Sequence, residues 1–222
     1  MVRDRLEIVE ERIAKAVARA GRQRSEITLV AVTKAFPASA IREGYEAGLR
    51  DFGENYVQEF EAKSLEVQDL PNSRFHFIGH LQSNKAKRAA QLFDVIQTVD
   101  SAKLARRLSE NFEGVTPLEV MLEVKLSPEE AKSGIEEAAL MELMAAVKAL
   151  PHLRLIGLMT MPPWSDDLEA SRPYFRELRV LAESCGLACL SMGMSHDLEV
   201  AIEEGATHIR VGTALFGPRK RP

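Results

Sequence analysis

Short apolar runs alternate with segments of helical periodicity along almost the whole chain, and this alternation limits the possible folds more than any other feature. Strands that alternate with helices form parallel sheets, and a count of eight favours closure into a barrel. The eight predicted strands span residues 27–33, 50–53, 74–78, 94–98, 118–124, 153–158, 187–191 and 207–211. The predicted helices between them span residues 38–47, 55–66, 83–91, 101–112, 135–149, 167–184 and 195–204. The sequence therefore predicts an α/β fold, a single (β/α)8 TIM-type barrel that takes up residues 1–222 as one domain.

The first segment, residues 2–20, is predicted to be an extra N-terminal helix, because Leu6, Val9 and Ile13 recur at helical spacing. It would complete the outer ring of helices or cover the bottom of the barrel. An open, doubly wound sheet is the alternative architecture. The loop after the first strand, Thr33–Pro37, lacks the G-x-G-x-x-G pattern of dinucleotide-binding sheets, which favours the barrel.

Lys34 stands at the end of the first apolar run, and barrels carry their functional groups at the C-terminal ends of strands. An ammonium held among valine, alanine and phenylalanine is costly to desolvate unless it is paired or used. Desolvation favours the neutral amine, and a neutral amine can attack an aldehyde to form a Schiff base. The alternative is an ordinary surface lysine at the end of a strand.

Two loops near the end of the chain have the composition of a phosphate site. Strand seven leads into Ser195 and strand eight into Thr213, and barrels commonly bind phosphate in these two loops. Gly193 and Gly212 let the backbone approach a ligand closely, while the two hydroxyl residues supply further donors. The alternative makes Ser195 a helix N-cap and Gly212 a turn residue.

Arg210 lies on the last predicted strand, where it shares one face with His208 while Ile209 and Val211 share the other. One of these faces points into the barrel, so the interior would hold a guanidinium near its top. A surface salt bridge is the alternative. Asn55, after the second strand, is expected to cap the next helix or to contact a ligand.

Composition excludes several other functions. The net charge of −4 and the pI of about 5.8 offer no attraction for nucleic acid or an anionic membrane, and no stretch approaches a membrane span. The charged N-terminus is unlike a signal peptide, and two cysteines, Cys185 and Cys189, indicate a reducing cytoplasm rather than a disulfide framework. His76 and His80 would lie about 13 Å apart on a strand, too far apart for one metal ion, so no metal site is predicted.

A set of short motifs, in this order along the chain, closely resembles one known family. The motifs are Ala31–Lys34, Phe52–Glu59, His76–Lys85, Lys132–Gly134, Gly157–Met159, Ser191–Ser195 and Arg210–Thr213. With these motifs the chain is similar to the pyridoxal 5′-phosphate homeostasis proteins (YggS/PROSC type), which are related to the N-terminal barrel of alanine racemase. The resemblance implies a cofactor, pyridoxal 5′-phosphate (PLP), held by Lys34 as a Schiff base. It also implies that Ser195, Gly212 and Thr213 hold the phosphate, that Arg210 faces the pyridine nitrogen and that Asn55 lies near the cofactor.

The resemblance implies a protein that binds PLP reversibly, maintains the intracellular supply and delivers the cofactor to apoenzymes, without robust catalysis. An arginine beside the pyridine nitrogen leaves that nitrogen unprotonated and the ring a weak electron sink. Racemases of the related fold add a β-domain with a catalytic tyrosine, and none of Tyr45, Tyr56 and Tyr174 has a matching position. Without that domain a monomer is expected. The alternative functions are a slow single-domain PLP-dependent amino-acid racemase and a structural barrel with no cofactor.

Overall fold

Eight parallel strands close into a barrel in the computed structural model, which describes residues 1–127 and 133–218. The strands are β1 (Thr28–Val32), β2 (Asp51–Glu54), β3 (Arg74–Phe77), β4 (Val95–Val99), β5 (Leu118–Lys125), β7 (Leu153–Met159), β8 (Cys189–Met194) and β9 (His208–Val211). Each strand pairs with the next one in the chain, and the pairing of β1 with β9 completes the ring. The predicted barrel is confirmed, and the open-sheet alternative is wrong because the ring has no free edge.

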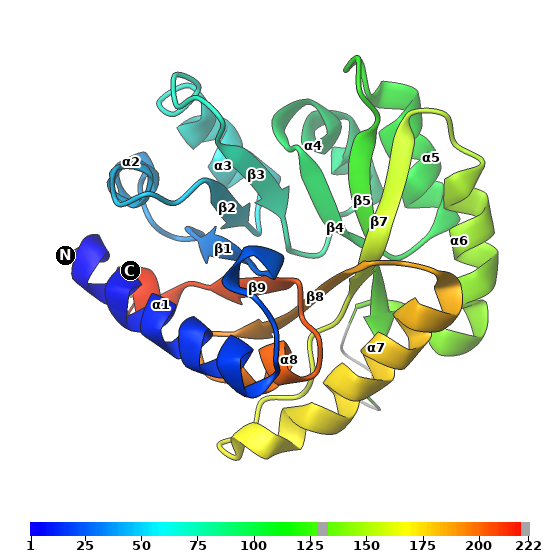
Figure 1. Ribbon diagram of the computed structural model, residues 1–222. Coiled ribbons are helices and arrows are strands. Elements are labelled where there is room, and N and C mark those ends of the chain that lie inside the picture. Colours follow the sequence, from blue (N-terminus) through cyan, green and yellow to red (C-terminus); the bar gives the residue numbers. More distant parts are fainter. Residues whose placement is uncertain (128–132, 219–222) are drawn as a thin grey trace.

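The helices surround this ring (Figure 1). They are α1 (Val2–Arg19), α2 (Ala38–Glu46), α3 (Val57–Ser64), α4 (Ala86–Leu92), α5 (Ala102–Asn111), α6 (Leu140–Lys148), α7 (Arg172–Cys185), α8 (Leu198–Glu203) and α9 (Thr213–Phe216). Short 3-10 turns are η1 (Arg24–Glu26), η2 (Ser83–Lys85), η3 (Glu137–Ala139) and η4 (Leu168–Ser171). The extra N-terminal helix is present as α1, which packs against α8 and α9 and so joins the outer ring.

The predicted helix at residues 135–149 and the predicted end of the seventh strand differ from the structure. Residues 135–149 do not form one helix, because Ile135 pairs with Val124 and opens a two-residue strand, β6 (Ile135–Glu136), before α6 begins at Leu140. The seventh strand of the barrel does not end at residue 191 but runs on to Met194 as β8. A register shift between Ser191 and Met194 conceals this extension from period-two reasoning. Lys132 of the Lys132–Gly134 motif lies outside the described residues.

The apolar core lies between the barrel and its helices. Ile209 and Val211 of β9 belong to this core, whereas the alternate residues His208 and Arg210 are buried on the other face of the strand, inside the barrel. All five residues of β4 are buried, as expected for a strand covered on both faces. The barrel interior is therefore a separate layer, and its polar side chains are the ones that reach the mouth.

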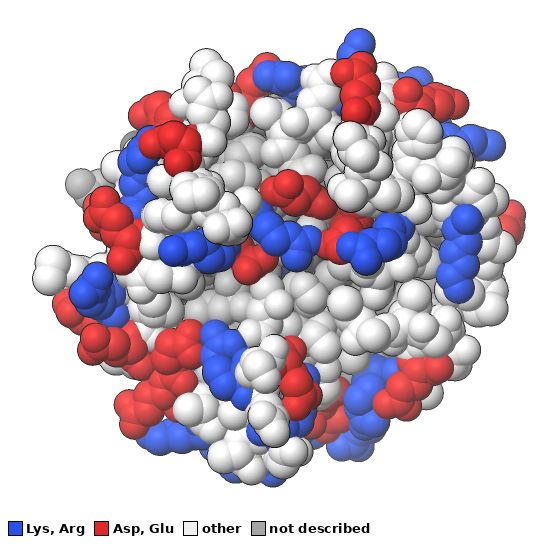
Figure 2. Space-filling model, turned by 45° about the horizontal axis from the view of Figure 1, so that its top comes forward, with Lys and Arg blue, Asp and Glu red and all other residues white. Residues whose placement is uncertain are grey.

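Acidic and basic side chains are interspersed on the face shown in Figure 2, in keeping with the small net charge of −4. Among the helices of residues 1–127 and 133–218, none is both long and apolar enough to cross a bilayer.

Candidate functional site

A cavity of about 550 Å³ opens at the C-terminal ends of the strands, a size typical of small-molecule sites. Its wall is contributed by the C-terminal ends of β1, β8 and β9 and by the segments that follow β1, β2, β3, β7, β8 and β9. The structure brings all six site residues predicted from the sequence to this one cavity: Lys34, Asn55, Ser195, Arg210, Gly212 and Thr213. Their roles in binding stay a prediction, but their convergence from the ends of four strands, β1, β2, β8 and β9, is a property of the fold.

Lys34 lies two residues beyond β1, inside a tight turn. The amide of Phe36 donates a hydrogen bond to the carbonyl oxygen of Thr33 at 3.0 Å, which closes the turn around the lysine. Ala35 has a φ of +63°, a left-handed conformation that residues with a side chain adopt at a cost. Such a cost persists only where surrounding contacts hold the backbone in place.

Those contacts come from Lys63 of α3, which sequence reasoning missed. The Lys63 ammonium donates to the Thr33 carbonyl oxygen at 3.0 Å and to the carboxylates of Glu54 and Glu59 at 2.9 and 2.6 Å. Glu59 in turn accepts from the amide of Ala35 at 2.6 Å. The residues before and after Lys34 are thus held by one buried ion cluster. Burial also raises the pKa of Glu54, although the neighbouring Lys63 opposes this shift.

Ser195 and the start of α9 form the second part of the wall. The Ser195 hydroxyl oxygen accepts hydrogen bonds from the backbone amides of Gly212 at 3.2 Å and Ala214 at 3.4 Å. The expectation that Ser195 is itself an N-cap is wrong: α8 begins three residues later, after its N-cap Asp197. Ser195 instead supplies an acceptor for two amides at the start of another helix, α9, amides that have no partner within that helix.

Arg210 is buried, with 3% of its surface exposed, so the alternative of a surface salt bridge is wrong. Its guanidinium donates to the hydroxyl oxygen of Ser191 at 2.7 Å and to the carbonyl oxygen of Thr160 at 3.0 Å. Burial lowers the pKa of Arg210 to about 10, which leaves the group charged at neutral pH. The same cause raises the pKa of Glu123 in the barrel interior to about 7, and the nearby Asp100 adds to this shift.

Two further wall residues escaped sequence reasoning, Trp164 and His196. Their rings pack in a tilted arrangement, with 4.7 Å between centroids and 33° between planes, and both line the cavity. Trp164 is the single tryptophan of the chain. Two polar atoms of the wall are buried without a hydrogen-bond partner, Nε2 of His196 and Oδ1 of Asn55. Unsatisfied buried atoms are costly, and a ligand would satisfy them. The only sequence feature that could have placed Trp164 in the cavity wall is its position in a loop that follows a strand.

The described residues contain no group of three or more histidine, cysteine, aspartate or glutamate side chains that could hold a metal ion. His76 is paired with Asp51 at 2.9 Å inside the barrel, whereas His80 is half exposed and pairs with Asp100 at 3.6 Å. The two histidines therefore have separate partners, and His80 lies beyond the end of β3.

Comparisons with known proteins agree with this geometry. The family described as "Alanine racemase, N-terminal domain" matches residues 5–220. The pyridoxal phosphate homeostasis protein of Pseudomonas aeruginosa is 50% identical over 214 residues, which cover 95% of this chain and 93% of that relative. The structure of PipY from Synechococcus elongatus with PLP bound has a TM-score of 0.85 and 38% identity, and the match covers 98% of this chain and 100% of PipY. The alanine racemase of Clostridium difficile 630 shares only the fold, with a TM-score of 0.73 at 13% identity over 97% of this chain and 57% of the racemase.

Proposed function

This chain belongs to the family of pyridoxal phosphate homeostasis proteins, which carries the alanine racemase N-terminal domain, and from this premise we propose that it is a reversible carrier of PLP. In this proposal residues 1–222 form one cofactor-binding domain. The single observation that carries it is that Lys34, the buried guanidinium of Arg210 and the loops joined by the Ser195–Gly212 hydrogen bond all line one cavity.

The residues present fit this cofactor. Lys34 offers the amine that an aldehyde requires, and the amides of Gly212 and Ala214 already bond to an oxygen atom, that of Ser195. The unsatisfied Oδ1 of Asn55 and the charged Arg210 supply an acceptor and a donor for the polar edge of a pyridine ring. This set of an amine, hydroxyl and amide donors, a guanidinium and an amide oxygen suits a phosphorylated aromatic aldehyde.

In the proposed mechanism Lys34 holds the cofactor as a Schiff base, and the turn fixed by Lys63 presents its amine to the cavity. Ser195, Gly212 and Thr213 bind the phosphate through hydroxyl and amide donors. Arg210, which is charged at neutral pH, donates toward the ring nitrogen and keeps it from taking up a proton. When bound, the cofactor supplies an electron sink, and an arginine at this position makes it a weak one.

Release to apoenzymes, rather than turnover, is the proposed role. The curated relatives are named homeostasis proteins. Among the residues that line the cavity in the described part of the chain there is no tyrosine, the residue that serves as a second base in the related racemases. We propose a monomer in the cytoplasm, a setting that agrees with the two unbridged thiols of Cys185 and Cys189.

The proposal is tested first by the visible absorption spectrum of the purified protein with added PLP, compared with Lys34→Ala and with the exposed-lysine control Lys15→Ala. A Schiff-base band in the wild type and in Lys15→Ala, trapped by borohydride on the peptide containing Lys34 and missing from Lys34→Ala, is the expected result. A wild-type protein without the band at excess PLP would refute the cofactor assignment.

A second experiment separates carrier from enzyme. The loaded protein is mixed with a PLP-dependent apoenzyme, with and without a trap for free PLP, and D/L-alanine interconversion is measured in parallel. Reactivation of the apoenzyme without sustained interconversion supports the carrier. Many racemisation turnovers for each molecule of protein would instead establish the slow racemase.

A further inference from the structure

A continuous line of hydrogen bonds runs through the barrel interior from its lower end to the cofactor cavity. Its lower member is Asp51, the first residue of β2, whose carboxylate lies 2.9 Å from Nε2 of His76. Nδ1 of His76 lies 3.0 Å from the side-chain nitrogen of Gln97. The Gln97 oxygen accepts from Ser191 at 2.6 Å, and Ser191 accepts from Arg210 at 2.7 Å.

The chemistry of the two ends fixes the direction of every bond in this line. A guanidinium only donates, so the Ser191 oxygen accepts from Arg210 and its hydroxyl hydrogen points to Gln97. The Gln97 amide nitrogen then donates to Nδ1 of His76, which places the imidazole hydrogen on Nε2, directed at the carboxylate of Asp51. All the bonds therefore point the same way, from the cation to the carboxylate.

The line crosses the barrel rather than following its wall. Ser191 belongs to β8 and Gln97 to β4, two strands that are not neighbours in the ring. Gln97, His76 and Ser191 are fully buried, and each has a partner on both sides. Aligned hydrogen bonds in a medium of low dielectric constant polarise one another, so the members of such a line act together.

The Arg210 guanidinium makes no direct ion pair in the part of the chain that the structure describes; the carboxyls of Asp197 and Glu123 act on it only through space. No carboxylate of residues 1–127 or 133–218 forms an ion pair with it within 4.0 Å, and its other hydrogen bond goes to the carbonyl oxygen of Thr160. A buried cation needs compensation. The line ends on the carboxylate of Asp51, whose side chain is 23% exposed. Through this line Arg210 is connected by hydrogen bonds to a carboxylate, in addition to the through-space effect of Asp197 and Glu123.

We propose that Asp51, His76, Gln97 and Ser191 are positioning residues that fix the guanidinium of Arg210 against the ring side of the cofactor from the opposite end of the barrel. The inference rests on the proposed function in that Arg210 is taken to face the pyridine nitrogen. It goes beyond that function because it assigns a role in cofactor binding to residues outside the cavity wall. A carboxylate at the lower end of the barrel then controls binding at the mouth.

The first test uses wild-type protein without cofactor, labelled with ¹⁵N, so that it does not depend on the proposed function. The expected spectrum shows a neutral His76 ring with its hydrogen on Nε2, and an Arg210 guanidinium whose signals move in Asp51→Asn. The matched control is Asp94→Asn, because Asp94 also lies at the start of β4 and accepts a hydrogen bond from β3, at the amide of Phe75. A hydrogen on Nδ1 of His76, or equal responses of Arg210 in both variants, would overturn the line.

The second test measures ligand affinity through the fluorescence of Trp164. Gln97→Leu keeps the size of the side chain but interrupts the line in its middle. The expected result is a Kd about tenfold higher for both PLP and pyridoxal, as for the loss of one charge-assisted hydrogen bond, with the Kd for inorganic phosphate unchanged. Asp51→Asn should also raise the Kd for PLP and for pyridoxal, whereas Asp94→Asn should change neither. Circular dichroism confirms that each variant is folded.

The two proposals fail in different ways. If the wild type takes up no PLP, the proposed function is wrong whatever the ¹⁵N spectrum shows. If the wild type binds PLP but Gln97→Leu and Asp51→Asn bind PLP and pyridoxal as the wild type does, the positioning role is wrong and the carrier remains. A loss that also includes inorganic phosphate would indicate general damage to the cavity and would likewise overturn it.

Discussion

The hydroxyl of Ser195 accepts a hydrogen bond from the backbone amide of Gly212 at 3.2 Å, although the two residues belong to different loops. The bond joins the segment after β8 to the segment after β9 at the wall of the cavity. A side-chain oxygen thereby engages an amide that would otherwise be unsatisfied. When an anion accepts the hydrogen bond from this amide instead, the Ser195 hydroxyl can rotate and donate its own hydrogen to the anion.

Replacing Ser195 with alanine is therefore expected to weaken phosphate recognition and little else. A hydrogen bond to a charged group contributes about 1.5–3 kcal/mol, so the Kd for PLP should rise about tenfold or more. Pyridoxal, which lacks the phosphate, should bind as it does to the wild type. The measurement is a titration followed by Trp164 fluorescence, with Ser184→Ala on the exposed face of α7 as the control. Equal losses for PLP and pyridoxal would contradict a phosphate role for Ser195.

A second prediction concerns Gly193, whose φ is +87° and whose added Cβ would lie 2.4 Å from the Cβ of Ala201. Gly21 also has a positive φ, +65°, but no atom lies within 4 Å of an added Cβ there. Gly21→Ala should cost about 1 kcal/mol of unfolding free energy, for backbone strain alone. Gly193→Ala should cost about 3 kcal/mol, because overpacking against α8 is added. Urea unfolding of the two variants measures the difference. Equal losses of unfolding free energy would show that α8 moves aside without cost.

Comparing the two glycines also shows why the sequence predicts some features and not others. The sequence predicted that Gly193 lets the backbone approach a ligand, and this stays a prediction. The crowding against Ala201 of α8 was not foreseen, because it depends on how the helix packs. The ring of eight strands was predictable because it follows from local periodicity and a count. The end of β8 was not, since a register shift between Ser191 and Met194 breaks the alternation on which the prediction depends.

Some residues of the candidate site could likewise be predicted from the sequence and others could not. Lys34 and Arg210 could be found from the sequence because each places a charge in an apolar strand segment, which is a local anomaly. Lys63 could not, since it lies in an ordinary polar helix pattern and its importance comes from contacts with Thr33 and Glu54. The line from Asp51 to Arg210 is likewise invisible in one dimension, because its members come from five different strands.

The third prediction is that Glu123 and His208 make the free energy of unfolding depend on pH in opposite directions, so that the two effects partly cancel in the wild type. Burial raises the pKa of Glu123 from 4.5 to about 7, so the folded state holds this proton more tightly than the unfolded state. Its contribution to stability is complete below pH 4.5 and is lost as the pH rises to about 7. Burial lowers the pKa of His208 from 6.5 to about 4, so its contribution is present above pH 6.5 and is lost as the pH falls to about 4.

The two contributions oppose each other between pH 4.5 and 6.5, and each corresponds to about 3 kcal/mol. Relative to the wild type, Glu123→Gln should gain about 3 kcal/mol of stability as the pH rises from 4.5 to 7.5. His208→Asn, which can keep the contact with Thr207, should gain a similar amount as the pH falls from 6.5 to 4. Urea unfolding of the three proteins across this range is the measurement. Differences from the wild type that do not change with pH would refute the assigned shifts.

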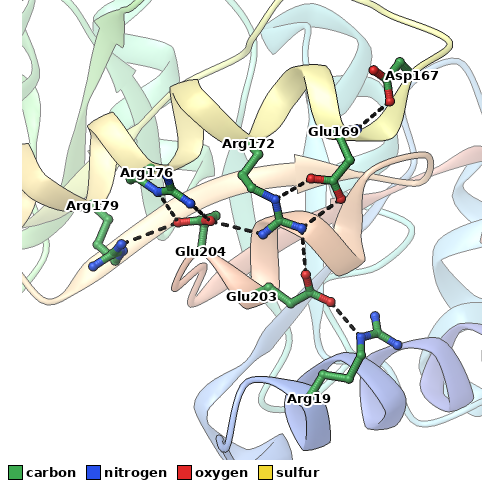
Figure 3. A network of polar contacts seen from close by, with 8 residues as sticks. All are labelled: Arg19, Asp167, Glu169, Arg172, Arg176, Arg179, Glu203 and Glu204. Atoms are coloured by element: carbon green, nitrogen blue, oxygen red, sulfur yellow. Dashed lines mark hydrogen bonds and ion pairs between the residues drawn. The ribbon is translucent and has the colours of Figure 1, made fainter.

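The last prediction concerns the ion-pair network that joins α7 to α8 and α1 (Figure 3). Glu204, whose side chain is 6% exposed, accepts from Arg172 at 3.1 Å and from Arg176 at 3.0 Å, and pairs with Arg179 at 3.4 Å. Figure 3 shows Arg172 between Glu169, Glu203 and Glu204, and Glu203 also reaches Arg19. Glu204 is thus the buried centre of a network whose outer members are exposed to solvent.

Glu204→Gln keeps the shape of the side chain and removes the charge that three guanidinium groups share. Removing one partner of a buried pair costs about 3–5 kcal/mol, and because Arg176 and Arg179 can rehydrate we expect about 2 kcal/mol here. The control is Glu183→Gln, which breaks one exposed pair with Arg179 and should cost less than about 1 kcal/mol. In 1 M NaCl the Glu183 effect should vanish, while the Glu204 effect persists because buried charges are screened much less. Urea unfolding of both variants at low and high salt is the measurement. If the effect of Glu204→Gln also vanished in 1 M NaCl, salt would screen the centre of the network as fully as its exposed outer pairs.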